Sequence, residues 1–132
     1  MPASAAPRLV LLNTVTAVES RHAGAVVVTG SHGGASVVRY ALAVPAVLYV
    51  FNDAGIGKDE AGVTALDELQ RAGQAAVAVA HSSARIGDAR DAWEHGIVSR
   101  ANRQAQALGL DVGARLRDSV KTSADMPAGA RP

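Results

Sequence analysis

Three predominantly apolar runs, at residues 25–29, 46–51 and 74–80, each stop at a loop of small and polar residues. Each loop is followed by a segment suited to a helix. Short apolar runs without alternation are typical of strands that are buried on both faces, as the strands of parallel sheets are. The repeated order of strand, loop and helix therefore predicts an α/β domain with right-handed crossovers between parallel strands.

The predicted fold class is a small open, mostly parallel sheet of about four or five strands with flanking helices, in a Rossmann- or flavodoxin-like topology. Residues 8–16 are β-prone and form either an edge strand or one arm of a hairpin. Asp59 and Glu60 are expected to open the second helix, because acidic side chains favour a helix N-terminus. Ser99 is expected to cap a later helix that stops at Gly109.

Length and composition indicate one globular domain at residues 8–120, with a flexible arm at residues 1–7 and a disordered tail at residues 121–132. The chain has no cysteine, which excludes a disulfide framework and cysteine metal sites. A net charge of +1 and an aromatic content of 3% argue against a nucleic-acid partner. We expect a cytoplasmic protein without a membrane partner, because neither a signal peptide nor a spanning run is evident.

The first loop, residues 29–34, reads Thr-Gly-Ser-His-Gly-Gly. Its glycines let backbone N–H groups approach a ligand, and the helix that follows adds its positive end, so a carboxylate or phosphate would fit. The alternative is a tight turn that binds nothing. The spacing matches neither the dinucleotide fingerprint nor a P-loop, so nucleotide binding is a weaker third option. His32 in this loop can be a general acid or base, or can hold the loop by a hydrogen bond.

The second loop, residues 52–59, is the densest polar stretch of the chain. Asp53 follows directly after the strand, where an acid commonly binds a ligand or a metal. Lys58 can hold a substrate anion, act as a base once desolvated, or simply pair with a neighbouring aspartate. The sequence leaves these alternatives open.

The third loop, residues 81–88, carries His81, which has the same chemical options as His32. Arg85 presents a planar guanidinium that suits a carboxylate or phosphate, or it braces the loops by pairing with an aspartate. Ser83 would be a nucleophile only with a base within reach. A standard hydrolase triad is not expected, because the sequence lacks a G-x-S-x-G elbow.

If the three strands are parallel neighbours, the three loops share one edge of the sheet, where open α/β folds bind their ligands. We therefore predict an enzyme that acts on a small anionic or polar metabolite, with hydrolase, lyase and isomerase chemistry all open. The alternative is a non-catalytic ligand-sensing module or a structural subunit. A homo-oligomer, most simply a two-fold dimer, is expected in either case. The predicted catalytic residues are His32, Asp53, Lys58 and Ser83, and the predicted ligand-binding residues are Ser31, Gly33, Gly34, Asn52, Ser82, Arg85 and Asp88.

No metal or other cofactor is predicted. The histidines and aspartates of the three loops include no pair at a standard helical ligand spacing such as H-x-x-x-H. A Mg²⁺ ion held by one or two carboxylates would leave little trace in a sequence, and it is the one metal kept as an alternative.

Overall fold

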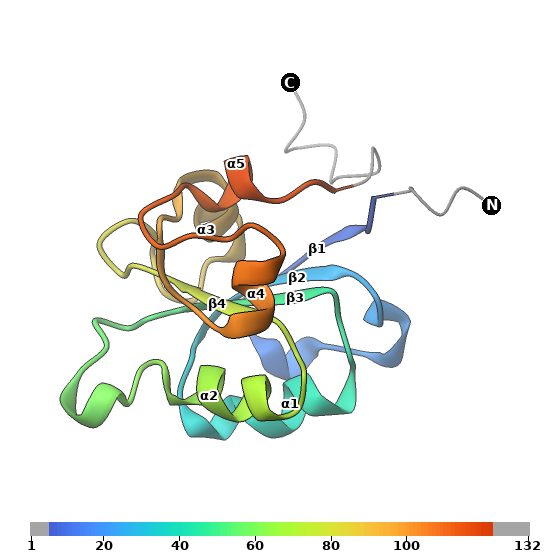
Figure 1. Cartoon of the computed structure of the whole chain (residues 1–132), viewed down its shortest axis with the longest axis horizontal. Coiled ribbons are helices and arrows are strands. Elements are labelled where there is room, and N and C mark those ends of the chain that lie inside the picture. Colours follow the sequence, from blue (N-terminus) through green and yellow to red (C-terminus); the bar gives the residue numbers. More distant parts are fainter. Residues whose placement is uncertain (1–5, 123–132) are drawn as a thin grey trace.

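The computed structural model describes residues 6–122, which form a five-stranded open sheet with helices on both faces (Figure 1). The strands are β1 (Leu9–Leu12), β2 (Val26–His32), β3 (Leu48–Asn52), β4 (Ala76–Val79) and β5 (Val98–Ala101). The helices are α1 (Val38–Ala43), α2 (Thr64–Arg71), α3 (Ala89–His95), α4 (Arg103–Ala107) and α5 (Leu116–Ser119), with 3-10 turns η1 (Val15–Ala17), η2 (Ser20–His22), η3 (Ala35–Val37) and η4 (Lys58–Glu60). The predicted arm and tail lie almost entirely outside the described residues.

The sheet is mostly parallel, with β1 to β4 parallel and β5 antiparallel to β4. The order of strands across it is β1-β2-β3-β4-β5. The predicted α/β class with an open, mostly parallel sheet is therefore confirmed. The Rossmann- or flavodoxin-like topology is not, because those folds reverse their strand order at a switch point, whereas here each strand lies beside its predecessor in the chain.

The sheet separates two hydrophobic cores. α1 and α2 cover one face, and α3, α4 and α5 cover the other (Figure 1). Val26 and Val28 of β2 belong to the core that includes Trp93 of α3, whereas Val27 belongs to the core that includes Leu66 of α2. All three valines are fully buried, so the central strands are apolar on both faces. This confirms the interpretation of the unalternating apolar runs.

The predicted start of the second helix is wrong. Asp59 and Glu60 lie in η4, where both have left-handed backbone angles with φ values of 56° and 57°, and α2 begins only at Thr64. The chain between them is shaped by Gly62, where an added Cβ would collide with the carbonyl oxygen of Asp53. This return of the chain to the end of β3 overrides the local preference of acidic residues for a helix start.

The predicted helix start at Ser99 is also wrong, because Ser99 lies in β5. The cap of the next helix is Asn102, whose side-chain oxygen accepts a hydrogen bond from the N–H of Ala105 at 3.1 Å. Serine and asparagine are both strong N-cap residues. Pairing of β5 with β4, which lies twenty residues earlier in the chain, decides between them. Among residues 6–122, no helix is long and apolar enough to cross a membrane.

Candidate functional site

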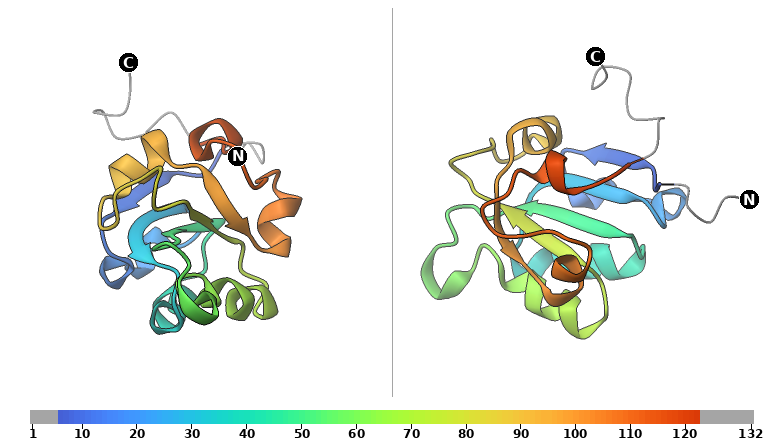
Figure 2. Two further views of the ribbon diagram at one scale, coloured as in Figure 1. Left: turned by 90° about the vertical axis from the view of Figure 1, so that its left-hand side faces the viewer. Right: turned by 45° about the horizontal axis from the view of Figure 1, so that its top comes forward.

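The loops that follow β2, β3 and β4 meet at one edge of the sheet, here called the carboxyl edge, which faces the viewer in the left view of Figure 2. Backbone hydrogen bonds join them directly. The N–H of Gly33 donates to the carbonyl of Asn52 at 3.2 Å, and that of Gly87 donates to Gly30 at 2.8 Å. The convergence on which the predicted site depends is therefore present.

Asp53 is the buried carboxylate of the carboxyl edge, with 3% of its surface exposed. Its Oδ1 accepts hydrogen bonds from the N–H groups of Gly55 at 2.8 Å and His81 at 3.0 Å. Burial alone would raise the pKa of Asp53, but hydrogen bonds from the Ser99 hydroxyl and from these two N–H groups outweigh it, so the pKa lies below its ordinary value. Asp53 is thus an ionised acid at neutral pH, fixed in place by two backbone donors.

His81 stands beside this carboxylate and is open to solvent, with 62% of its side chain exposed. Its Nδ1 lies 3.4 Å from Oδ1 of Asp53. The backbone of Gly55 flanks the ring, since a Cβ at Gly55 would lie 3.7 Å from it. A carboxylate at Nδ1 favours the neutral tautomer that carries its proton there and leaves Nε2 as a free base. We call these two residues the Asp53–His81 pair.

His32 lies at the same edge but has a different partner. Its Nδ1 accepts a hydrogen bond from the N–H of Gly34 at 3.0 Å, so the neutral ring carries its proton on Nε2. β3 separates β2 from β4, which sets their backbones roughly 10 Å apart. The hydrogen bond between His32 and Gly34 matches the alternative in which His32 holds the turn.

The predicted anion loop uses its polar groups internally. The N–H of Gly33 donates to backbone carbonyls, and that of Gly34 to His32. The hydroxyl of Ser31 accepts the N–H of Val15 at 2.9 Å, which ties the loop to η1. The helix that follows is short, with six residues in α1. The role of these residues in anion binding stays a prediction. The N–H groups of Gly33 and Gly34 are already used, whereas the Ser31 hydroxyl accepts here and keeps its proton for another acceptor.

Three other predicted residues serve as internal braces. The side chain of Asn52 is buried and donates to the carbonyl of Ala84 at 2.9 Å. The hydroxyl of Ser83 donates to the carbonyl of Ala80 at 2.7 Å and accepts the N–H of Ile97 at 2.9 Å. Asp88 is the third, as the N-cap of α3. These contacts hold the third loop against the ends of β3 and β4.

Asp88 caps α3 by accepting the N–H of Asp91 at 2.9 Å. The remaining predicted residues, Lys58, Ser82 and Arg85, are exposed. Lys58 lies in η4, within the loop that projects from the sheet in Figure 1. The backbone N–H of Arg85 donates to the carboxylate of Asp91 at 2.7 Å, so the third loop is fixed to α3 as well.

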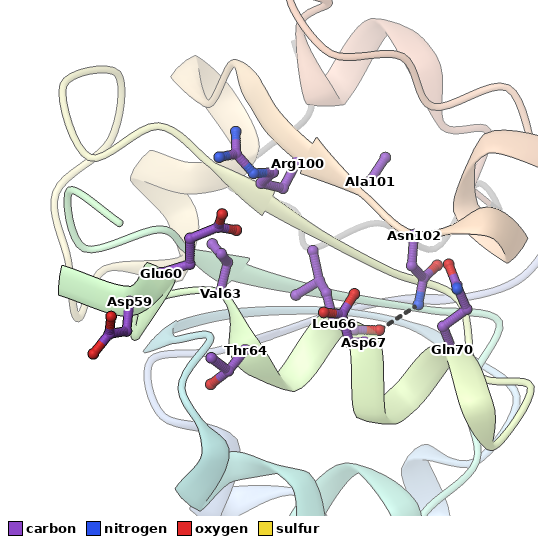
Figure 3. A pocket seen from close by; sticks show the side chains of 10 residues that line it. All are labelled: Asp59, Glu60, Val63, Thr64, Leu66, Asp67, Gln70, Arg100, Ala101 and Asn102. Atoms are coloured by element: carbon purple, nitrogen blue, oxygen red, sulfur yellow. Dashed lines mark hydrogen bonds between the residues drawn. The ribbon is translucent and has the colours of Figure 1, made fainter. Parts of the chain in front are cut away.

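A hollow of about 500 Å³ lies between α2 and β5, and we call it the α2–β5 hollow (Figure 3). Asp59 and Glu60 of η4 reach it, together with Arg100 and Asn102. Neither Arg100 nor Asn102 was among the predicted site residues, because residues 99–108 had been assigned to one helix. The local signal for a strand there is the β-branched pair Ile97 and Val98, directly before Ser99.

Within residues 6–122, no group of three or more histidine, cysteine, aspartate or glutamate side chains is arranged to hold a metal ion. Comparison of the chain with protein-family models, with curated proteins and with solved structures found no match. The chemistry of the molecule must therefore be argued from its own geometry.

Proposed function

We propose that the protein is a cytoplasmic enzyme that uses His81 as a general acid and base on a small anionic or polar metabolite, with Asp53 as the residue that positions it. The observation that carries this proposal is the Asp53–His81 pair, a buried ionised carboxylate 3.4 Å from the Nδ1 atom of an exposed imidazole. An exposed imidazole beside a buried carboxylate, at the carboxyl edge of a parallel sheet, suits proton transfer to and from a bound ligand.

In this mechanism Nε2 of His81 takes a proton from the substrate or from a water molecule, and the imidazolium that forms is stabilised by the Asp53 carboxylate. The same proton is returned to the product or leaving group, which regenerates the neutral ring. Hydrogen bonds from Ser99, Gly55 and His81 keep Asp53 from taking that proton itself. The scheme serves isomerisation, elimination or hydrolysis, and the substrate determines which one occurs.

The test is a screen of purified protein against mixtures of small carboxylates, phosphates and sugars, with proton NMR as the readout and heavy water as the solvent. Solvent deuterium that enters a metabolite reports proton transfer even without net turnover. We expect His81→Gln to lower that rate about 10²- to 10⁴-fold. His95→Gln is the matched control, because His95 forms a 2.9 Å pair with Asp91 on the exposed surface of α3. Equal rates in His81→Gln and wild type would reject His81 as the acid and base.

A non-catalytic role is the second candidate, and the internal use of the Gly33, Gly34 and Ser31 groups favours it. In that case the carboxyl edge is a brace, and the protein is a ligand-sensing module or a structural subunit of a homo-oligomer. Sedimentation measures the mass of the protein in solution, with and without the metabolite mixtures, and so shows whether it forms a homo-oligomer and whether a ligand changes that state. Binding without any exchange or turnover in the screen supports the second candidate.

A further inference from the structure

The α2–β5 hollow is connected to the Asp53–His81 pair through two short segments of the chain. Ser99, whose hydroxyl lowers the pKa of Asp53, precedes Arg100, whose side chain lines the hollow. On the other side, the chain at Gly62 packs against the Asp53 carbonyl and continues into Val63, which also lines the hollow. Two segments that lie against Asp53 thus continue along the chain into residues that line the hollow.

The charges of the hollow are unequal. Asp59, Glu60, Asp67 and Arg100 line it, three carboxylates against one guanidinium. Figure 3 shows Glu60 and Arg100 at one end, and Asp67 with Gln70 at the other. A ligand that neutralises this set carries more positive than negative groups, yet still offers Arg100 an anion.

The guanidinium of Arg100 makes few hydrogen bonds to the described part of the protein. It donates to the carbonyl of Ser99 at 3.2 Å, and within residues 6–122 it forms no ion pair. Its planar N–H groups are therefore available to a carboxylate, which such a fork binds through two parallel hydrogen bonds. Asn102, by contrast, is saturated: its side chain bonds to Leu66, Gln74, Ala76 and Ala105. It forms the rigid floor rather than a contact for a ligand.

We propose that the α2–β5 hollow is the substrate pocket of the Asp53–His81 pair and that it takes a basic amino acid or a close derivative. The ligand's carboxylate pairs with Arg100, and its ammonium or guanidinium groups pair with Asp67 and Glu60. The aliphatic part packs on Val63 and Leu66. A volume of about 500 Å³ is in the range of small-molecule sites. This inference rests on the proposed function for its catalytic half and on the hollow for its binding half.

The experiment is an NMR titration of ¹⁵N-labelled protein with L-lysine, L-norleucine and cadaverine. Norleucine is lysine without the side-chain amine, and cadaverine is lysine without the carboxylate. We expect lysine to shift the amide signals of residues 60–67 and 99–102 in a saturable way. The affinity of each fragment is expected to be at least about tenfold lower than that of lysine, because each fragment lacks one charged contact.

Two variants assign the ends of the ligand. Arg100→Gln is expected to weaken lysine about tenfold and to leave cadaverine unchanged, and Asp67→Asn is expected to weaken lysine and to leave norleucine unchanged. Glu68→Gln is the matched control, because Glu68 is the next residue of α2 and pairs with Arg71 outside the hollow. The amide spectrum of each variant confirms that it is folded. Lysine that binds no better than its fragments, or that is indifferent to Arg100→Gln, would overturn the proposal.

Lysine binding and proton exchange, measured on wild type and on His81→Gln, distinguish this inference from the proposed function. His81 does not line the hollow, so His81→Gln is expected to bind lysine as wild type does. Lysine binding in wild type without proton exchange or turnover of any basic amino acid would reject the enzyme and retain the pocket. Turnover of some other metabolite through His81, without lysine binding, would retain the enzyme and reject the ligand class.

Discussion

The loops after β2 and β4 end at the same edge of the same sheet, and each presents a histidine, but the two regions differ in what they do with their polar groups. At the end of β2, His32 accepts a backbone N–H, and Ser31 and the neighbouring glycines bond to the chain. After β4, His81 faces a buried carboxylate and leaves its second nitrogen to solvent. Position at the end of a strand therefore does not define a site; the partner of each side chain does.

Gly30→Ala is expected to produce the largest effect, because it tests whether the glycine near the end of β2 serves packing. A Cβ at Gly30 would overlap the backbone of Gly87 and Asp88, which cannot move aside as a flexible side chain could. We expect a loss of about 3 kcal/mol in the free energy of unfolding, measured by urea denaturation.

Gly24→Ala is the control for that measurement. Gly24 has a φ of +79° but nothing within 4 Å of its added Cβ, so its cost is the backbone strain alone, about 1 kcal/mol. If the two variants lose equal stability, the loop after β2 is not held by close backbone packing, and its glycines are free to serve a ligand.

Asp53→Asn is expected to have the next largest effect. The change removes the charge that the N–H groups of Gly55 and His81 hold in place, and it costs about 2 kcal/mol at pH 7. The pKa of Asp53 is lowered from 3.8 in the folded protein, so its contribution to stability is present above about pH 4 and is lost as the pH falls through the folded pKa. Urea denaturation at pH 7 and at pH 3 is therefore expected to show a smaller difference between the variant and wild type at the lower pH. A difference that does not change with pH would contradict the ionised state.

Ser83→Ala is expected to cost about 1 kcal/mol in unfolding free energy, because the hydroxyl makes two hydrogen bonds to the backbone. The exchange activity of wild type, once a metabolite is found, should remain. Ser82→Ala is the control, since Ser82 is exposed and should change neither quantity. Loss of activity with full stability in Ser83→Ala would restore Ser83 as the predicted nucleophile.

The sequence was informative wherever the controlling forces are local. The valines of β2 pack into the cores on both faces of the sheet. A run of such residues can be recognised without knowing which strands pair with it. Asp53 follows such a run directly, so its place at the carboxyl edge was predictable. Asp88 caps a helix through a residue three positions away, which is also a local pattern.

The parts that were missed depend on residues far apart in the chain. β5 is a strand because it pairs with β4, and without that pairing its residues resemble a helix start. Arg100 and the α2–β5 hollow were missed with it. The choice between His32 and His81 depends on a carboxylate that approaches within 3.4 Å of only one of them. No spacing in the sequence encodes that approach, because it is set by the packing of three loops.

The smallest expected effect is the most direct test of the difference between the two histidines, and it concerns where each neutral ring carries its proton. His32 accepts at Nδ1 from Gly34 and is expected to be the Nε2-protonated tautomer. His81 faces Asp53 through Nδ1 and is expected to be the Nδ1-protonated tautomer. Long-range ¹H–¹⁵N correlation spectra, recorded at a pH where both rings are neutral, distinguish the two forms. Asp53→Asn should move the His81 pattern toward the Nε2 form and leave that of His32 unchanged. If His81 is already Nε2-protonated in wild type, its outer nitrogen is a donor rather than a base, and the proton transfer proposed here would have to begin from another residue.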